Sequence, residues 1–230
     1  PPHFFFNDTA TTEIYFFYVH ESIAIYTTGA TVPLKIRPGH FATNHAHINY
    51  YIDVTTLKAR TKEAEEVAQA LVGMYLYDTV IDTIVCMEGT EVIGAFLAEE
   101  LAKGGFLSTN AHKSIYVISP EFNNNSQIIF RDNLIPMIRD KHVMILMASV
   151  TTGRTLNKAV ESIQYYGGIL QGASAIFSAM DSLDGVPIKS VFGKKDLPDY
   201  TYSDYRDCPL CKAGKKIDAL VNTFGYSPMG

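Results

Sequence analysis

The chain has 230 residues, of which 47% are hydrophobic and 19% are charged, and its formal net charge is −5. This length and composition are typical of a soluble globular protein with one sizeable core. The negative charge argues against a nucleic-acid partner or an anionic membrane surface, and no stretch approaches the roughly 20 apolar residues that cross a bilayer. Three cysteines are too few for a disulfide scaffold and fit a reducing compartment, so we expect a cytoplasmic protein.

The N-terminal segment differs in character from the rest of the chain. The stretch Phe4–Tyr15 (FFFNDTATTEIY) resembles a translated sequencing adapter. It has neither the basic start nor the small-residue cleavage site of a signal peptide. We therefore expect residues 1–25 to be non-native or disordered, and we leave them out of the fold prediction.

The first half of the ordered chain alternates between strand and helix patterns. His47–Val54 is rich in aromatic and β-branched residues, which predicts a strand. Apolar residues at helical spacing predict a helix over Lys58–Tyr77. Asp82–Met87 is a short apolar run, typical of a strand buried on both faces, and Glu91–Leu101 follows as a second helix.

The second half continues the alternation. Ser114–Ser119 and His142–Met147 are predicted strands, whereas Glu121–Gln127 is polar without periodicity and predicts a mobile loop. A helix is predicted over Arg154–Tyr166 and a strand over Ile169–Phe177. The order predicts an α/β fold with a mostly parallel sheet flanked by helices. We place this domain at residues 26–180 and a loop-rich C-terminal appendage at 181–230.

The turn after the most apolar strand is the best candidate for a ligand site. Ligands bind beyond the carboxyl ends of parallel strands, which is where Thr151-Thr152-Gly153-Arg154-Thr155 lies. Small residues and glycine let a phosphate approach the backbone N–H groups and the following helix N-terminus. The same residues also suit a turn that merely caps the helix. The strand before it and the parallel alternation favour the phosphate site.

This block resembles the ribose-phosphate signature of type I phosphoribosyltransferases, in which a hydrophobic strand leads through two acids to Thr-Thr-Gly-x-Thr. Three other segments follow the order of the orotate phosphoribosyltransferases. His40–Asp53 resembles their substrate-side strand, Met87–Thr90 their pyrophosphate loop and Glu121–Phe130 their flexible catalytic loop. The resemblance covers roughly Pro33–Ser178, and it implies a type I phosphoribosyltransferase-like fold.

The resemblance also implies a function. It is transfer of ribose 5-phosphate between phosphoribosyl diphosphate and a nitrogenous base, with Mg²⁺, in a homodimer of nucleotide metabolism. The 5-phosphate of this substrate, or of a nucleoside monophosphate, would be held by Ser149, Thr151, Thr152, Gly153, Arg154 and Thr155. The pyrophosphate would face Glu88, Gly89 and Thr90. Glu88 suits Mg²⁺ or a ligand hydroxyl, and it equally suits an acid at a helix N-terminus.

The sequence departs from the family pattern at two places. Ala148 and Ser149 stand where the family has its paired acids, and Ile118–Gln127 contains no cation, although Arg131 lies just beyond it. Because losing preorganised groups slows a reaction by orders of magnitude, we assign no catalytic residue. Three readings stay open: an orotate-type transferase, a catalytically silent sensor that binds nucleotides or ribose phosphates, and an unrelated α/β protein with a coincidental turn. We expect Gly153→Val to abolish phosphate binding by filling the anion's place, and acids at positions 148 and 149 to strengthen sugar binding.

The C-terminal appendage contains Cys208-Pro209-Leu210-Cys211, which has the spacing of half a zinc site. No second cysteine pair exists, and the histidines His40, His45 and His47 are distant in sequence. We therefore predict a turn with two reduced thiols and no metal site; a metal shared between subunits and a redox CxxC are the alternatives. His45 and His47 suit either a position near the base and pyrophosphate or the wet face of an edge strand. Lys212–Gly225 is expected to form a short helix.

Overall fold

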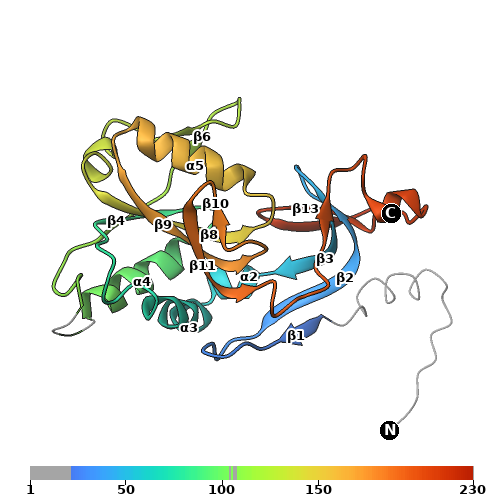
Figure 1. The fold of residues 1–230 in the computed structure, drawn as a ribbon, viewed down its shortest axis with the longest axis horizontal. Helices are drawn as coiled ribbons and strands as arrows, with labels where there is room; N and C mark the ends of the chain where they lie inside the picture. The colour runs from blue at the N-terminus through green and yellow to red at the C-terminus, as the bar shows by residue number, and fades with distance from the viewer. Residues whose placement is uncertain (1–21, 104, 106–107, 230) are drawn as a thin grey trace, which may run out of the picture.

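A computed structural model of the chain describes residues 22–103, 105 and 108–229, so the prediction for the N-terminal segment lies largely outside the described residues. The described residues form two large sheets that lie side by side (Figure 1). The central sheet has the strand order β10-β11-β9-β8-β4-β5. Its strands are β4 (Thr83–Cys86), β5 (Tyr116–Ile118), β8 (His142–Val150), β9 (Ile169–Ser178), β10 (Ser182–Leu183) and β11 (Val186–Gly193).

The central sheet is parallel except at one edge. β5, β4, β8, β9 and β11 run in the same direction, and β10 pairs antiparallel with β11. The predicted strands over 82–87, 114–119, 142–147 and 169–177 are confirmed as β4, β5, β8 and β9. The predicted domain end at residue 180 needs correction, because β11 pairs with β9 and extends this sheet to Gly193.

Helices cover both faces of the central sheet, as predicted (Figure 1). α3 (Thr61–Val72) and α4 (Glu91–Lys103) pack on one face, and α5 (Arg154–Tyr165) packs on the other. Successive strand residues point to opposite faces, so Ile84 joins the core under α3 and α4 while Val85 joins the core under α5. The predicted helix over 58–77 is divided into α2 (Thr55–Ala59) and α3. Arg60, whose backbone is extended (φ −90°, ψ 122°), interrupts it.

The second sheet has the order β12-β3-β2-β13-β14, with β1 also paired to β2. Its strands are β1 (Ile23–Ile25), β2 (Leu34–Ala42), β3 (His47–Asp53), β12 (Tyr202–Ser203), β13 (Ala219–Asn222) and β14 (Gly225–Pro228). β3 confirms the predicted strand at 47–54. All pairs are antiparallel except β13 with β2. The prediction of a mostly parallel sheet therefore holds for the central sheet alone.

The helix predicted over 212–225 is wrong. The chain instead forms the short helix α6 (Pro209–Lys212) and then the hairpin β13–β14. The two residues Thr223 and Phe224 connect these strands, and Asn222 Oδ1 accepts a hydrogen bond from the Phe224 N–H at 2.9 Å. This side-chain contact is typical of Asn in tight turns. It stabilises the hairpin turn in a segment whose helical pattern is weak.

The segment predicted as a loop at 121–127 is part of a hairpin made by β6 (Glu121–Phe122) and β7 (Ile128–Ile129). Asn123 Oδ1 accepts hydrogen bonds from the backbone N–H groups of Asn125 and Gln127, both at 2.9 Å, which closes the turn. A single-turn 3₁₀ helix, η1 (Ile135–Met137), follows before β8. The polar composition that predicted a loop is the composition that stabilises this tight turn.

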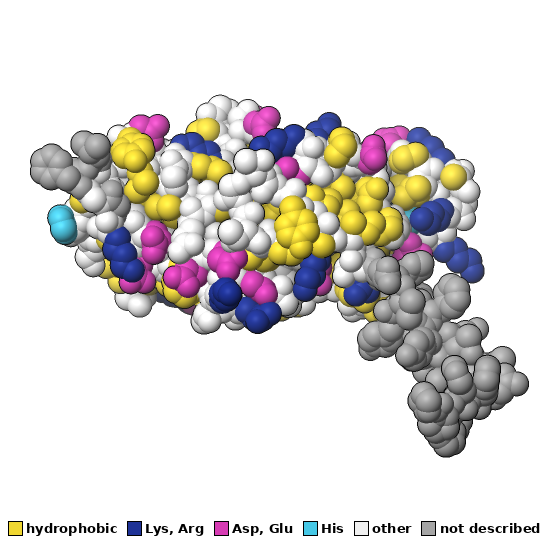
Figure 2. Space-filling model, turned by 90° about the horizontal axis from the view of Figure 1, so that it is seen from below, with side chains coloured by type: hydrophobic (Ala, Val, Ile, Leu, Met, Phe, Trp, Pro, Cys, Tyr) yellow, Lys and Arg dark blue, Asp and Glu magenta, His cyan; other side chains and the backbone are white. Residues whose placement is uncertain are grey.

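The outer surface carries charges of both signs. On the face in Figure 2, acidic and basic side chains are interspersed, and hydrophobic side chains gather over the part of the molecule that holds β1 to β3. Among the described helices, none combines the length and the apolar character that a bilayer crossing requires.

Candidate functional site

The turn between β8 and α5 presents a row of backbone N–H groups. The first N–H group of α5 that has a backbone acceptor is that of Asn157, which donates to the Gly153 carbonyl oxygen at 2.8 Å. Within the described part of the chain, no acceptor is found for the N–H groups of residues 151–156. Gly153 precedes the helix with φ 74°, a left-handed conformation that glycine adopts without strain. Such a turn at a helix N-terminus is suited to bind an anion.

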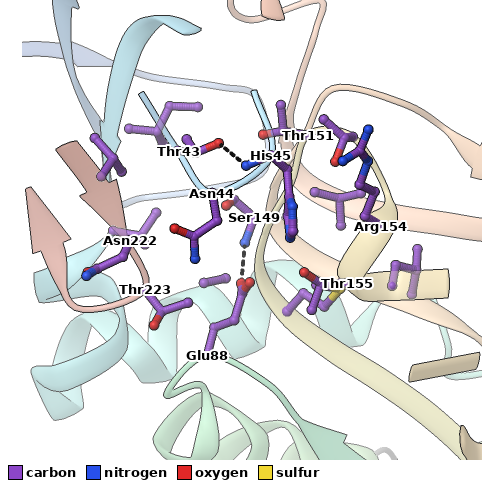
Figure 3. Close-up of a pocket in the computed structure, with 18 of the residues that line it drawn as sticks. Thr43, Asn44, His45, Glu88, Ser149, Thr151, Arg154, Thr155, Asn222 and Thr223 are labelled. Carbon is purple, nitrogen blue, oxygen red and sulfur yellow. Dashed lines mark hydrogen bonds between the residues drawn. The ribbon is translucent and has the colours of Figure 1, made fainter. Parts of the chain in front are cut away.

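A pocket of about 210 Å³ lies above this turn (Figure 3). The six residues predicted to bind phosphate, Ser149 and 151–155, all line it. One of their hydroxyls is already engaged, because the Thr151 Oγ1 lies 3.0 Å from the Tyr200 hydroxyl, which is buried beneath the turn. The structure thus brings the predicted residues together around an open space, with their backbone donors available to a ligand.

Positive charge gathers at the rim of the pocket beside the turn. His45 lies on the connection between β2 and β3, and Figure 3 shows its ring next to Arg154. Partial burial and the positive charges of Arg154 and Lys158 lower the pKa of His45. Thr43 positions the histidine, because its Oγ1 accepts a hydrogen bond from the His45 N–H at 3.2 Å. Of the two predicted histidines, His45 therefore lies at the pocket, whereas His47 points elsewhere.

The loop between β4 and α4 contributes a carboxylate from the opposite side. Glu88 and Gly89 are both left-handed, with φ of 59° and 81°. Glu88 Oε2 accepts a hydrogen bond from the Ser149 N–H at 3.4 Å (Figure 3). Burial raises the pKa of Glu88, although the N–H groups of Ser149 and Ala148 and the charge of Lys58 oppose that shift. The carboxylate therefore sits at the end of β8, where the sequence has no acid of its own.

The other two residues of this predicted loop lie outside the pocket lining. Thr90 is fully buried, and its hydroxyl donates hydrogen bonds to the carbonyl oxygens of Met87 at 2.9 Å and Leu146 at 3.0 Å. It ties the loop to the sheet and has no free hydroxyl to offer a ligand. Gly89 is exposed, and a Cβ at its position would lie 3.6 Å from Lys58 Nζ.

Lys58 is a pocket residue that the sequence analysis missed. Its ammonium group donates hydrogen bonds to the carbonyl oxygens of Glu88 at 2.7 Å and Thr223 at 3.2 Å. Burial lowers the pKa of Lys58, while the nearby acids Glu88, Glu91 and Asp53 raise it. An ammonium group has three donor hydrogens, so one remains for a ligand. No sequence motif marks this lysine, which comes from α2 and meets the loop only in the folded chain.

The β13–β14 hairpin forms the far wall of the pocket and was also missed. Val221, Asn222, Thr223 and Gly225 line the pocket opposite the β8–α5 turn. β13 reaches this position because Ala219 and Leu220 pair with the end of β2. The short apolar run Ala219–Val221 before Asn222, with Gly225 shortly after it, is also compatible with a hairpin, which the helix prediction overlooked.

The reason predicted for the effect of Gly153→Val needs correction. A Cβ at Gly153 would lie 2.8 Å from Leu183 Cδ2, so it points at β10 and away from the anion's place. The glycine is required by its left-handed backbone and by this contact. Substitutions there act on the shape of the turn.

The CxxC thiols have neighbouring histidines that the sequence analysis did not place beside them. His40 of β2 and His47 at the start of β3 lie beside Cys208 and Cys211, although more than 160 residues separate the pairs in sequence. This cluster lies outside the pocket lining and is described further below.

Comparison with known proteins identifies the fold. No protein-family model matches the sequence, and no curated protein matches it. The structure is similar to a phosphoribosyltransferase from Corynebacterium diphtheriae, with a TM-score of 0.50 and 14% identity over 70% of this chain and 91% of that chain. It is also similar to the UMP synthase of Leishmania donovani, with a TM-score of 0.51 and 18% identity over 71% of this chain and 34% of that larger chain. The chain has a phosphoribosyltransferase fold, as the resemblance of its motifs implied.

Proposed function

We propose that this protein is a phosphoribosyltransferase of the orotate type, which transfers ribose 5-phosphate from phosphoribosyl diphosphate to a nitrogenous base. The observation that carries the proposal is the row of backbone N–H groups at 151–156 that opens on a pocket. A phosphate dianion there accepts several of these hydrogen bonds and lies at the positive end of α5. Arg154 adds positive charge at the same place, and this charge helps to lower the pKa of the neighbouring His45.

The opposite end of the pocket suits the pyrophosphate group. When the bond from ribose to pyrophosphate breaks, negative charge grows on the leaving group, and a positioned cation stabilises it. Lys58 lies at the Glu88 carbonyl with one donor hydrogen unused. We assign to Lys58 the stabilisation of this charge, which the lysine-free hairpin β6–β7 does not provide.

Glu88 suits the Mg²⁺ ion that the resemblance implies. Mg²⁺ is commonly held by one or two carboxylates together with substrate phosphates, and Glu88 is the carboxylate of the pocket lining. Its position at the amides of Ala148 and Ser149 also supports a role near the ribose hydroxyls. The ion would neutralise charge on the diphosphate. Glu88 would hold the ion or accept a hydrogen bond from the sugar.

The remaining wall offers groups that recognise a base. Asn44 and Asn222 carry side-chain amides, and Thr223 carries a hydroxyl, all labelled around the pocket in Figure 3. Amides both donate and accept hydrogen bonds, as the edge of a nitrogenous base requires. The similarity to a UMP synthase and the order of the sequence motifs support a pyrimidine base such as orotate.

A nucleotide or ribose-phosphate sensor is the second candidate function. It is favoured by Ala148 and Ser149, which lack the carboxylates of an active family member. It is also favoured by Arg131, whose Nη2 and Nε lie 2.6 and 2.9 Å from the same Glu121 oxygen, so that this cation is neutralised. Such a protein binds the ligand through the β8–α5 turn and releases no pyrophosphate.

Pyrophosphate release from phosphoribosyl diphosphate separates the two functions. The purified chain is incubated with Mg²⁺ and either orotate or a purine base, and nucleotide binding is measured in parallel by calorimetry. Turnover with one base that is lost in Lys58→Met, and kept in the exposed control Lys62→Met, supports the transferase. Tight binding without turnover for any base supports the sensor. Absence of binding contradicts both. The homodimer and the cytoplasmic location remain predictions, and light scattering tests the former.

A further inference from the structure

Four side chains with metal-binding atoms converge at the β2–β3 hairpin of the second sheet, outside the pocket lining. They are His40 in β2, His47 at the start of β3, Cys208 just before α6 and Cys211 within α6. Their four ligand atoms all lie within 4.8 Å of one another. Histidine nitrogens and thiolates are the ligands that zinc prefers.

The separations match the edges of a tetrahedron around one ion. With Zn–N near 2.05 Å and Zn–S near 2.3 Å, tetrahedral geometry places two nitrogens about 3.3 Å apart and a nitrogen about 3.6 Å from a sulfur. His40 Nε2 lies 3.1 Å from His47 Nδ1. The same Nε2 lies 3.5 Å from Cys208 Sγ and 3.6 Å from Cys211 Sγ, and Cys211 Sγ lies 3.2 Å from His47 Nδ1. Each of these four separations is within a few tenths of an ångström of the ideal edge.

The backbone around the cluster orients His40 as a ligand. His40 is fully buried, and its Nδ1–H donates a hydrogen bond to the carbonyl oxygen of Lys215 at 2.9 Å. With the proton on Nδ1, the lone pair of Nε2 faces the two sulfurs. Histidines that bind metals commonly donate their second N–H to a carbonyl or carboxylate in this way. This contact is independent of the distances among the four ligand atoms.

We propose that these four residues bind one Zn²⁺ ion in a closed, structural site. All four coordination positions are filled by protein, which is typical of structural rather than catalytic zinc. Two nitrogen and two sulfur ligands in tetrahedral geometry favour zinc over Mg²⁺ and Ca²⁺, which prefer oxygen ligands. The cysteines are free thiols in the structure, and the two histidines beside them distinguish the site from a redox CxxC.

The ion would fix the wall of the ligand pocket. It joins the β2–β3 hairpin to the segment that leads into β13, whose end carries Asn222 and Thr223. The backbone of His40 is already bound to this segment through the Asp218 carboxylate at 2.7 Å and the Asp218 N–H at 2.7 Å. Zinc binding would stabilise this connection beyond what the two hydrogen bonds provide. Its removal should loosen residues 219–228 and leave the β8–α5 turn intact.

Metal analysis of the full chain tests the proposal without any assay of transfer activity. The protein is purified without metal supplements or a histidine tag, and zinc is measured by mass spectrometry and by release to a chromogenic chelator. We expect one zinc per chain in the wild type and in His45→Ala, which removes a histidine of the same hairpin outside the cluster. Cys211→Ser, a change at an exposed position, should weaken zinc binding by at least about tenfold.

Cobalt substitution checks the geometry in the same protein. Co²⁺ in the site should give the strong visible absorption of a tetrahedral ion and a thiolate charge-transfer band, and Cys211→Ser should weaken that band. Hydrogen exchange should rise at 219–228 on zinc removal. A wild-type chain with no zinc, a cobalt spectrum without thiolate bands, or a Cys208–Cys211 disulfide in place of the metal would overturn the proposal. A failed transferase assay would leave all three readouts unaffected.

Discussion

Replacing Gly153 by alanine tests the conformation on which the anion site depends. Gly153 has φ 74° and ψ −3°, immediately before the first residue of α5. An alanine there has two costs, a left-handed backbone and a Cβ at 2.8 Å from Leu183 Cδ2. The backbone cost is about 1–2 kcal/mol, and crowding adds about 1 kcal/mol, at the low end of overpacking costs, because the leucine end is free to turn.

Gly185→Ala is the matched control. Gly185 has φ 83° and lies in the turn that follows Leu183, but a Cβ there meets no atom within 4 Å. It therefore carries the backbone cost without the crowding. We expect Gly153→Ala to lower the free energy of unfolding by about 2–3 kcal/mol and Gly185→Ala by about 1–2 kcal/mol. Leu183→Ala should cost less in the Gly153→Ala background than in the wild type, because it removes the collision.

Urea unfolding gives these free energies, and calorimetry with a nucleoside 5′-monophosphate gives the affinity. Gly153→Ala should weaken binding at least about tenfold, equal to about 1.4 kcal/mol, because the displaced turn redirects the N–H groups of residues 154 and 155. Gly185→Ala should leave the affinity near the wild-type value. Equal affinity in Gly153→Ala and the wild type would refute the assignment of this turn as the phosphate site.

Three further predictions concern charged groups. Burial raises the pKa of Asp82, but hydrogen bonds from the backbone and ring of His142 and from a lysine outweigh it and lower the pKa to about 2. The lowered pKa contributes about 2 kcal/mol to the free energy of unfolding above pH 4, and this contribution is lost as the pH falls toward 2. Asp82→Asn should remove it, so the free energy of unfolding should fall less steeply with pH in the acid range. Lys58→Met should lower kcat at least tenfold with little change in nucleoside monophosphate affinity; an equal loss in both would contradict a role at the pyrophosphate. Glu88→Gln should weaken ribose phosphate binding several-fold, and adding Ser149→Asp should recover it, whereas no recovery would show that the two positions do not share the sugar site.

The parts of the fold that were predicted correctly depend on local patterns. The strands β4, β8 and β9 are largely apolar runs, and α5 begins directly after a glycine in a left-handed conformation. The residues of the β8–α5 turn are adjacent in sequence, so their approach to one ligand follows from one strand, one turn and one helix. That is why all six predicted phosphate residues line the pocket.

The parts that were missed depend on pairing between distant segments. Lys58 reaches the Glu88 loop only because α2 folds beneath it, and Asn222 reaches the pocket only because β13 pairs with β2. His40 meets Cys208 through the same long-range pairing. No local sequence pattern predicts these contacts, because they form only when the strands of the second sheet pair across long stretches of chain.

Amide resonances of the ¹⁵N-labelled chain, followed during titration with ribose 5-phosphate, test the central claim most directly. The account predicts saturable downfield proton shifts centred on the backbone N–H groups of residues 151–156, since these groups gain a charged acceptor where they have none. Smaller changes should appear at His45, on the rim of the pocket. Saturable shifts elsewhere with these six amides unmoved, or no shifts at millimolar ligand, would contradict it.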